Sequence, residues 1–135
     1  MDKPTLEKVI KFAVRTDHFF VATADSNGLP HIAAAGEIFL NSEGFIEVAA
    51  WFCHTTVMNL QQNHHISLVV WDQDKDRGYQ LLGILEKIQE IAMMDGYVPD
   101  VEEKVHFPQV EYKLIIRVDT ILDFSQSGQS DREIQ

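Results

Sequence analysis

The sequence contains one cysteine, Cys53, so no disulfide bond can form within the chain. No uninterrupted apolar run approaches the roughly 20 residues with which a helix crosses a bilayer. Residues 1–4 lead into an amphipathic segment instead of the apolar stretch of a signal peptide. Together these absences predict a protein of a reducing, cytoplasmic setting that does not enter a membrane.

Positive charge is scarce as well. The chain has 11 Lys and Arg against 21 Asp and Glu, which gives a formal net charge of −10 at pH 7. This charge would repel a nucleic-acid backbone, and no run of Lys and Arg offers a basic patch to offset it. Nucleic acid is therefore excluded as the expected partner.

What is present is the composition of a folded globular protein. Of the 135 residues, 45% are hydrophobic and 24% are charged, which suffices for one compact domain with a core. No internal repeat, low-complexity block or linker divides the chain. We expect a single domain over residues 1–124, followed by a polar tail at 125–135 that is frayed unless a partner chain holds it.

Apolar periodicity predicts two helices and a series of short strands. One helix is expected over residues 5–15, and a second, shorter helix over 55–62 links two strands. Beyond residue 83 the pattern fits a strand about as well as a helix, and we favour a strand followed by a helix, with a short acidic helix at 101–105. Strands are expected at 19–24, 29–35, 37–40, 45–50, 65–71, 79–85, 110–118 and 119–124.

The residues between these strands indicate antiparallel connections. Asp25-Ser26-Asn27-Gly28 and Asn41-Ser42-Glu43-Gly44 are both typical of hairpin turns. We therefore expect the first strands to form an antiparallel meander. The predicted fold class is mainly β with flanking helices, in the form of a small closed or split antiparallel β-barrel.

Several segments, taken in order, resemble a known family. They are the strand 20–25, the turn Gly28-Leu29-Pro30-His31, the strand end, hydroxyl-rich turn and helix of 51–63, and the strands at 66–70 and 78–83. These segments resemble the pyridoxamine 5′-phosphate oxidase-like FMN-binding split-barrel family. The resemblance implies an FMN-binding split barrel, a homodimer with FMN near the subunit interface, and flavin-dependent oxidoreductase chemistry on an unknown substrate.

Thr55 and Thr56 stand where a strand gives way to a helix, so their hydroxyls and the free N–H groups of the first helical turn can converge on a phosphate. His54 adds a donor beside them, and Asn59, one turn later, either binds or packs. The alternative is that the two threonines only cap the helix. In the family this turn usually carries Arg or Lys, so affinity for a phosphate should be lower here unless another cation compensates. The candidates are Lys8, Lys11, Arg15, Lys113 and Arg117.

The run Ala33-Ala34-Ala35 has side chains small enough for a flat aromatic ring to lie against the strand backbone. The resemblance implies that the flavin ring also contacts the strand that ends at residue 52. The residues assigned to the ring are Ala33, Ala34, Ala35, Ala49, Ala50, Trp51 and Phe52. A narrow barrel interior would need small residues too, so the two interpretations are compatible.

No side chain stands out as a general acid or base, so no catalytic residue is predicted. His64 and His65 point to opposite faces of a strand and have no third ligand at metal spacing. The turn with Asp72, Asp74 and Asp76 lacks the Gly and Glu positions of a calcium-binding loop. No metal site is expected.

Large apolar residues favour a homodimer, because a barrel of this size cannot easily bury all of them alone. Examples are Phe39, Trp71, Ile84 and Ile115. Two functions other than a flavin oxidoreductase stay open. One is a non-catalytic flavin or electron carrier, and the other is a dimeric barrel that binds a partner without any cofactor.

Overall fold

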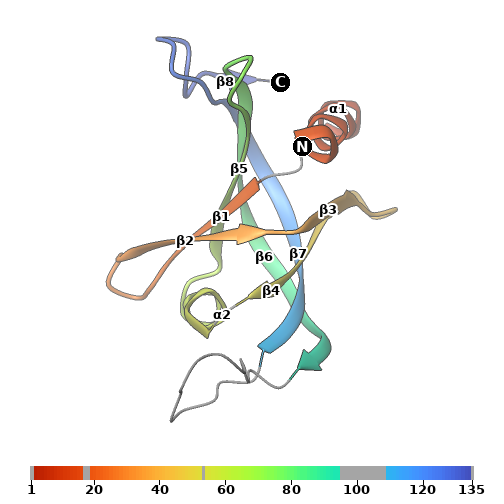
Figure 1. Ribbon diagram of the computed structural model, residues 1–135, viewed down its shortest axis with the longest axis vertical. Coiled ribbons are helices and arrows are strands. Elements are labelled where there is room, and N and C mark those ends of the chain that lie inside the picture. Colours follow the sequence, from red (N-terminus) through yellow and green to blue (C-terminus); the bar gives the residue numbers. More distant parts are fainter. Residues whose placement is uncertain (1, 17–18, 53, 95–108, 135) are drawn as a thin grey trace, which may run out of the picture.

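The computed structural model describes residues 2–16, 19–52, 54–94 and 109–134. In these ranges the chain forms two helices and one antiparallel sheet (Figure 1). None of the described helices has the length and apolar content needed to span a membrane. The helices are α1 (Lys3–Thr16) and α2 (His54–Gln62), and the strands are β1 (Phe19–Ala24), β2 (Pro30–Ala35), β3 (Glu37–Leu40), β4 (Ile46–Phe52), β5 (His65–Asp72), β6 (Arg77–Met94), β7 (Gln109–Asp123) and β8 (Glu133–Ile134).

The strand order in the sheet is β2-β1-β5-β6-β7-β4-β3, with β8 paired to β7. The sheet curls until Cα atoms of β2 and β4 approach within 8 Å. This confirms the predicted fold class, an antiparallel split β-barrel with flanking helices.

The predicted meander is wrong, because β2 and β3 lie at opposite edges of the sheet. Only Gly36 stands between Ala35, the last residue of β2, and Glu37, the first residue of β3. A hairpin needs a loop of about two residues at the least. The chain therefore continues from one edge strand into the other across the split, and does not fold back on itself.

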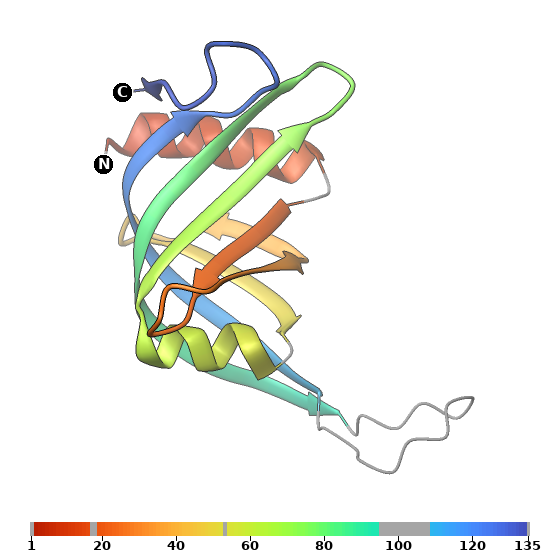
Figure 2. The same ribbon diagram turned by 90° about the vertical axis from the view of Figure 1, so that its left-hand side faces the viewer.

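Alternate strand residues and one face of each helix form the core. Val21 of β1 and Leu68 of β5 are fully buried. The amphipathic helix α1 places Leu6 and Val9 in this core and packs against β3 and β5, whereas α2 buries Leu60 and packs against β1 and β2. The two predicted helices are thus confirmed, and they lie at opposite ends of the barrel (Figure 2).

β6 and β7 form a long two-stranded ribbon that runs from the pair Tyr79↔Asp123 to the pair Met94↔Gln109, with three register shifts. The helix that we favoured somewhere beyond residue 83 is not found as far as Met94, and the alternative of a continuous strand is the one observed. Because β7 offers a pairing strand along this whole length, tertiary pairing overrides the local helical pattern. The breaker cluster at 95–100 and the predicted helix at 101–105 lie outside the described residues.

The polar segment after Phe124 is not frayed but folds back on the barrel. Glu133 and Ile134 form β8 and pair with β7. The Oδ1 atom of Asp76 accepts hydrogen bonds from Nε1 of Trp71 at 3.1 Å and from the backbone N of Gln126 at 2.9 Å. The rings of Trp71 and Phe124 pack edge to face with centroids 6.0 Å apart. Trp71 and Asp76 are distant in sequence from the tail, so its local composition could not reveal these contacts.

Candidate functional site

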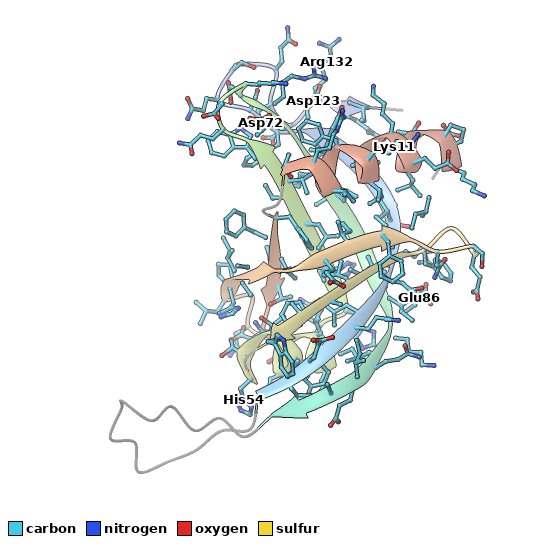
Figure 3. The ribbon with its side chains drawn as sticks, turned by 45° about the vertical axis from the view of Figure 1, so that its right-hand side comes forward. Lys11, His54, Asp72, Glu86, Asp123 and Arg132 are labelled. Carbon is cyan, nitrogen blue, oxygen red and sulfur yellow. The ribbon has the colours of Figure 1, made fainter. Side chains whose placement is uncertain are left out.

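The predicted phosphate-binding residues lie at the start of α2. His54, the first residue of this helix, lies at the end of the barrel opposite Lys11 of α1 (Figure 3). His54 and Thr55 are exposed, whereas Thr56 is only 1% exposed. The Oγ1 atom of Thr56 lies 3.4 Å from Nδ1 of His31 on β2. The two threonine hydroxyls therefore meet different surroundings, one solvent and the other an imidazole.

Asn59 is buried one turn further along α2. It is 6% exposed, and its Nδ2 donates a hydrogen bond of 3.1 Å to Oγ1 of Thr23, which is 4% exposed. This contact joins α2 to β1. Among the described residues no buried side-chain nitrogen or oxygen lacks a hydrogen-bond partner. Packing alone accounts for the burial of Asn59, and its role as a cofactor ligand stays a prediction.

Replacing Asn59 by leucine should lower the free energy of unfolding by about 1–3 kcal/mol, because the Thr23 hydroxyl would stay buried without its donor. The double variant Thr23→Val, Asn59→Leu should recover much of that loss, since both partners then become apolar. Urea denaturation of Asn59→Leu, Thr23→Val, the double variant and the parent measures the difference. A double variant as unstable as the sum of its single changes would contradict this account of the contact.

The residues predicted to line a flavin ring are brought together only in part. Ala33 and Ala35 of β2, together with Ala50 of β4, are partly buried and pack against the core where these two strands approach each other. Ala49 is buried and Phe52 belongs to the core. The exposed members, Ala34 on β2 and Trp51 on β4, lie on the outward faces of their strands.

None of the five predicted compensating cations lies beside the start of α2. Lys8, Lys11 and Arg15 belong to α1, at the opposite end of the barrel (Figure 2). The Nζ atom of Lys113 lies 3.2 Å from Oε1 of Glu47 and 5.6 Å from the ring centroid of Phe39. Arg117 forms ion pairs of 3.1 Å with Glu86 and 3.5 Å with Asp119.

Two residues of this region, His31 and Thr23, were not predicted from the sequence. His31 alternates with Ala33 and Ala35 along β2, so strand periodicity alone would have placed it on their face. Thr23 shares its strand face with the core residues Phe19 and Val21, but nothing local indicates that its partner comes from α2.

Parts of four neighbouring strands carry no acidic residue, lysine or arginine. The stretches 19–24, 29–36, 65–71 and 78–85 contain none of these residue types. Their outward side chains form two cross-strand rows, which we call the uncharged face: Ile32, Ala22, Ser67 and Leu82 in one row, and Ala34, Phe20, Val69 and Gln80 in the other. A groove of about 470 Å³ borders this face at Ala22, Ser67 and Leu82, and its lining also includes Asp119 of β7.

Solved structures of other proteins share the fold of this chain. No family model and no curated protein matches the sequence. HupZ of Group A Streptococcus is 20% identical with a TM-score of 0.65, over 96% of this chain and 98% of that chain. An FMN-binding protein from Syntrophomonas wolfei is 19% identical with a TM-score of 0.67, over 94% and 90%.

A third solved structure extends over nearly the whole chain. It is a protein from Clostridium acetobutylicum related to general stress protein 26, of the pyridoxinephosphate oxidase family, at 17% identity and a TM-score of 0.62 over 99% and 94%. At such identities the likeness shows the fold alone. The chain therefore has the split-barrel fold that these three proteins share.

Proposed function

We propose that this protein binds FMN and acts as a flavin-dependent oxidoreductase of the pyridoxamine 5′-phosphate oxidase-like type. The observation that carries the proposal is the meeting of three elements at the split of the barrel: β2, the end of β4 and the start of α2. A structural neighbour with this fold is described as an FMN-binding protein. A reducing cytoplasm stays our prediction for the location of the protein.

The residues at the split fit the ring of a flavin. β2 is an edge strand, so the backbone N–H and C=O groups on its free side have no partner strand among the described residues. These groups can donate and accept hydrogen bonds at the edge of a flat heterocycle. Ala33 and Ala35 are small and partly buried, and no larger side chain stands on the same face of β2 between residues 32 and 36.

The protein's part is to hold and orient the cofactor. When bound, the flavin supplies the redox chemistry, which side chains of this chain cannot supply. The strand backbone would fix the plane of the ring, and the exposed hydroxyl of Thr55 and the N–H groups of the first α2 turn would face the ribityl phosphate. Both contacts would come from regular elements, which would hold the cofactor in a defined orientation.

Titration with FMN should show saturable binding of one flavin per chain, with quenching or a shift of the flavin spectrum. The variant Ala33→Leu should bind at least about tenfold more weakly, because the added atoms occupy the space beside β2. Ala92→Leu, an exposed position on β6, is the matched control and should bind as the parent does. No uptake of FMN or riboflavin at about 100 µM, a concentration far above ordinary cofactor affinities, would contradict the proposal and favour a cofactor-free binding protein.

We further infer that the uncharged face joins two copies of the chain. Each copy carries a formal charge of −10, so two copies repel each other wherever acidic surfaces meet. The uncharged face avoids this repulsion. It also carries Ile32, which is 67% exposed, and Phe20, which is 44% exposed, while Leu29 beside it is 68% exposed. An isologous interface would place these side chains against the groove of the other copy.

A further inference from the structure

A groove of about 300 Å³ lies between the last turn of α1 and the edge strand β3. Its lining comes from Ala13 and Val14 of α1, from Phe19 of β1, and from Gly36 and residues 37–39. Pockets that bind small organic molecules have volumes of about 300–1,000 Å³. The groove is therefore of a size for a molecule with one small ring.

Two apolar side chains of this groove are in contact with water. Val14 is 59% exposed and Phe39 is 40% exposed, whereas Ala13 and Ile38 are buried. An apolar ring that covered Val14 and Phe39 would remove their surface from water, which favours binding. The ring of Phe39 can also contact a second ring or a cation. The groove therefore fits a ligand with an apolar body.

Glu37 is the titratable residue that lines the groove. Its side chain is exposed, and within the described part of the chain its carboxylate has no ion-pair or hydrogen-bond partner. Glu47 on the neighbouring strand β4 differs, because its carboxylate lies 3.2 Å from Nζ of Lys113 and accepts a hydrogen bond from Asn41. The negative charge of Glu37 can therefore pair with a ligand.

The other charges around the groove preserve this negative polarity. The lining residues of α1 belong to its last turn, and the C-terminal end of a helix carries a partial negative charge. Arg15 lies in the same turn but does not line the groove. Lys113, whose Nζ lies 5.6 Å from the ring centroid of Phe39, is paired with Glu47. The net charge of −10 on the whole chain attracts cations and repels anions, so a cationic ligand is favoured.

The groove begins where the proposed flavin site ends. Ala35, the last residue of β2, pairs with Phe19, and Phe19 lines the groove. Gly36 follows Ala35 and also lines the groove, so no side chain at this position separates the two. A molecule in the groove would therefore lie beside a flavin ring held against β2. This step rests on the proposed function, from which the position of the ring is taken.

We propose that the groove between α1 and β3 binds a small apolar molecule that carries a cationic group, and holds it beside the flavin ring. The apolar body covers Val14 and Phe39, and the cationic group pairs with Glu37. A hydrogen bond between charged partners is roughly twice as strong as one between neutral partners. The charge of Glu37 therefore distinguishes a cation from a neutral or anionic molecule of the same shape.

The experiment titrates three probes into the full chain at neutral pH, followed by NMR: 2-phenylethylammonium, its neutral counterpart 2-phenylethanol, and the anion 3-phenylpropionate. We expect the ammonium to bind about three- to fivefold more tightly than the alcohol, as a partly exposed ion pair allows, and the carboxylate to bind most weakly. The amide signals of Val14, Gly36 and Phe39 should shift. With FMN bound, the ammonium should also change the absorption spectrum of the flavin.

Variants at two exposed positions test the role of charge in the groove. Glu37→Gln should remove the preference for the ammonium and leave binding of the alcohol unchanged. Val14→Lys should weaken binding of the ammonium and make 3-phenylpropionate the preferred probe. Glu90→Gln is the matched control, because it removes the same charge from an exposed position on β6. It should keep the preference of the parent.

The outcomes separate the groove from the flavin site. Equal binding of the three probes, or a preference that survives Glu37→Gln, would overturn the proposed groove site. A flavin spectrum that bound ammonium leaves unchanged would overturn its position beside the ring. A chain that takes up no flavin, yet binds the ammonium through Glu37, would overturn the proposed function and leave the specificity of the groove standing.

Discussion

Replacing Ile32 by aspartate should convert a dimer into a monomer. Ile32 is 67% exposed on the outward side of the edge strand β2, so the change costs the isolated chain little. In a two-fold dimer built on the uncharged face it would bury two carboxylates without partners. Each unpaired buried charge costs several kcal/mol, so the dissociation constant should rise by about 10³-fold or more.

Light scattering at micromolar protein, with FMN present, measures this change. Ile91→Asp is the matched control, because Ile91 is 47% exposed on β6 outside the uncharged face, and it should leave the dimer intact. A parent protein of monomeric mass would refute the interface outright. A dimer that survives Ile32→Asp but dissociates with Ile91→Asp would move the interface to the far half of β6.

Replacing Gly83 by alanine should cost about 3 kcal/mol or more in the free energy of unfolding. Gly83 lies at a register shift of β6 where it pairs with Val118 of β7. A Cβ atom there would overlap the backbone carbonyl oxygen of Arg117 and lie 3.0 Å from Cγ2 of Ile116. The carbonyl belongs to the central strand β7 and cannot shift without disturbing its pairing. Overpacking in a fixed core costs about 1–3 kcal/mol and sometimes more.

Alanine restricts the unfolded chain more than glycine does, which stabilises the folded state by about 0.4–1 kcal/mol. This stabilisation is too small to offset the clash. Gly128→Ala is the control, because a Cβ at that position meets no atom within 4 Å. Denaturant unfolding should show a lowered midpoint for Gly83→Ala and a midpoint within the range of ordinary surface changes for Gly128→Ala. Equal midpoints for the two variants would mean that the β6 and β7 backbones separate there at little cost.

The sequence was sufficient for most elements, because helix and strand periods are local properties. The strand at 19–24 and the two helices were predicted close to their observed bounds, and the split barrel is confirmed. The order of the strands in the sheet depends on pairings between segments that are distant in sequence. Whether β2 turns back or crosses the barrel depends on the single residue Gly36, and the pairing of β1 with β5 joins segments that the whole of β2 to α2 separates.

The candidate site could be predicted only in part for the same reason. The hydroxyl-rich start of α2 was visible in the sequence, but the burial of Thr56 against His31 and of Asn59 against Thr23 depends on contacts between distant segments. The sequence offered five distant lysines and arginines as possible cations for the site but gave no means to choose among them. In the structure Lys113 and Arg117 are held by acidic neighbours on their own sheet.

The pairing of β4 with β7 has a consequence for how the chain acquires its fold. Phe52 pairs with Val110 and Ile46 with Ile116, so two segments far apart in the chain must meet before this side of the barrel closes. A newly made chain therefore exposes the apolar edge of β4 until β7 has been synthesised. Proteins dominated by such distant pairings fold slowly, in about milliseconds to seconds. During that interval the unpaired edge of β4 is open to aggregation.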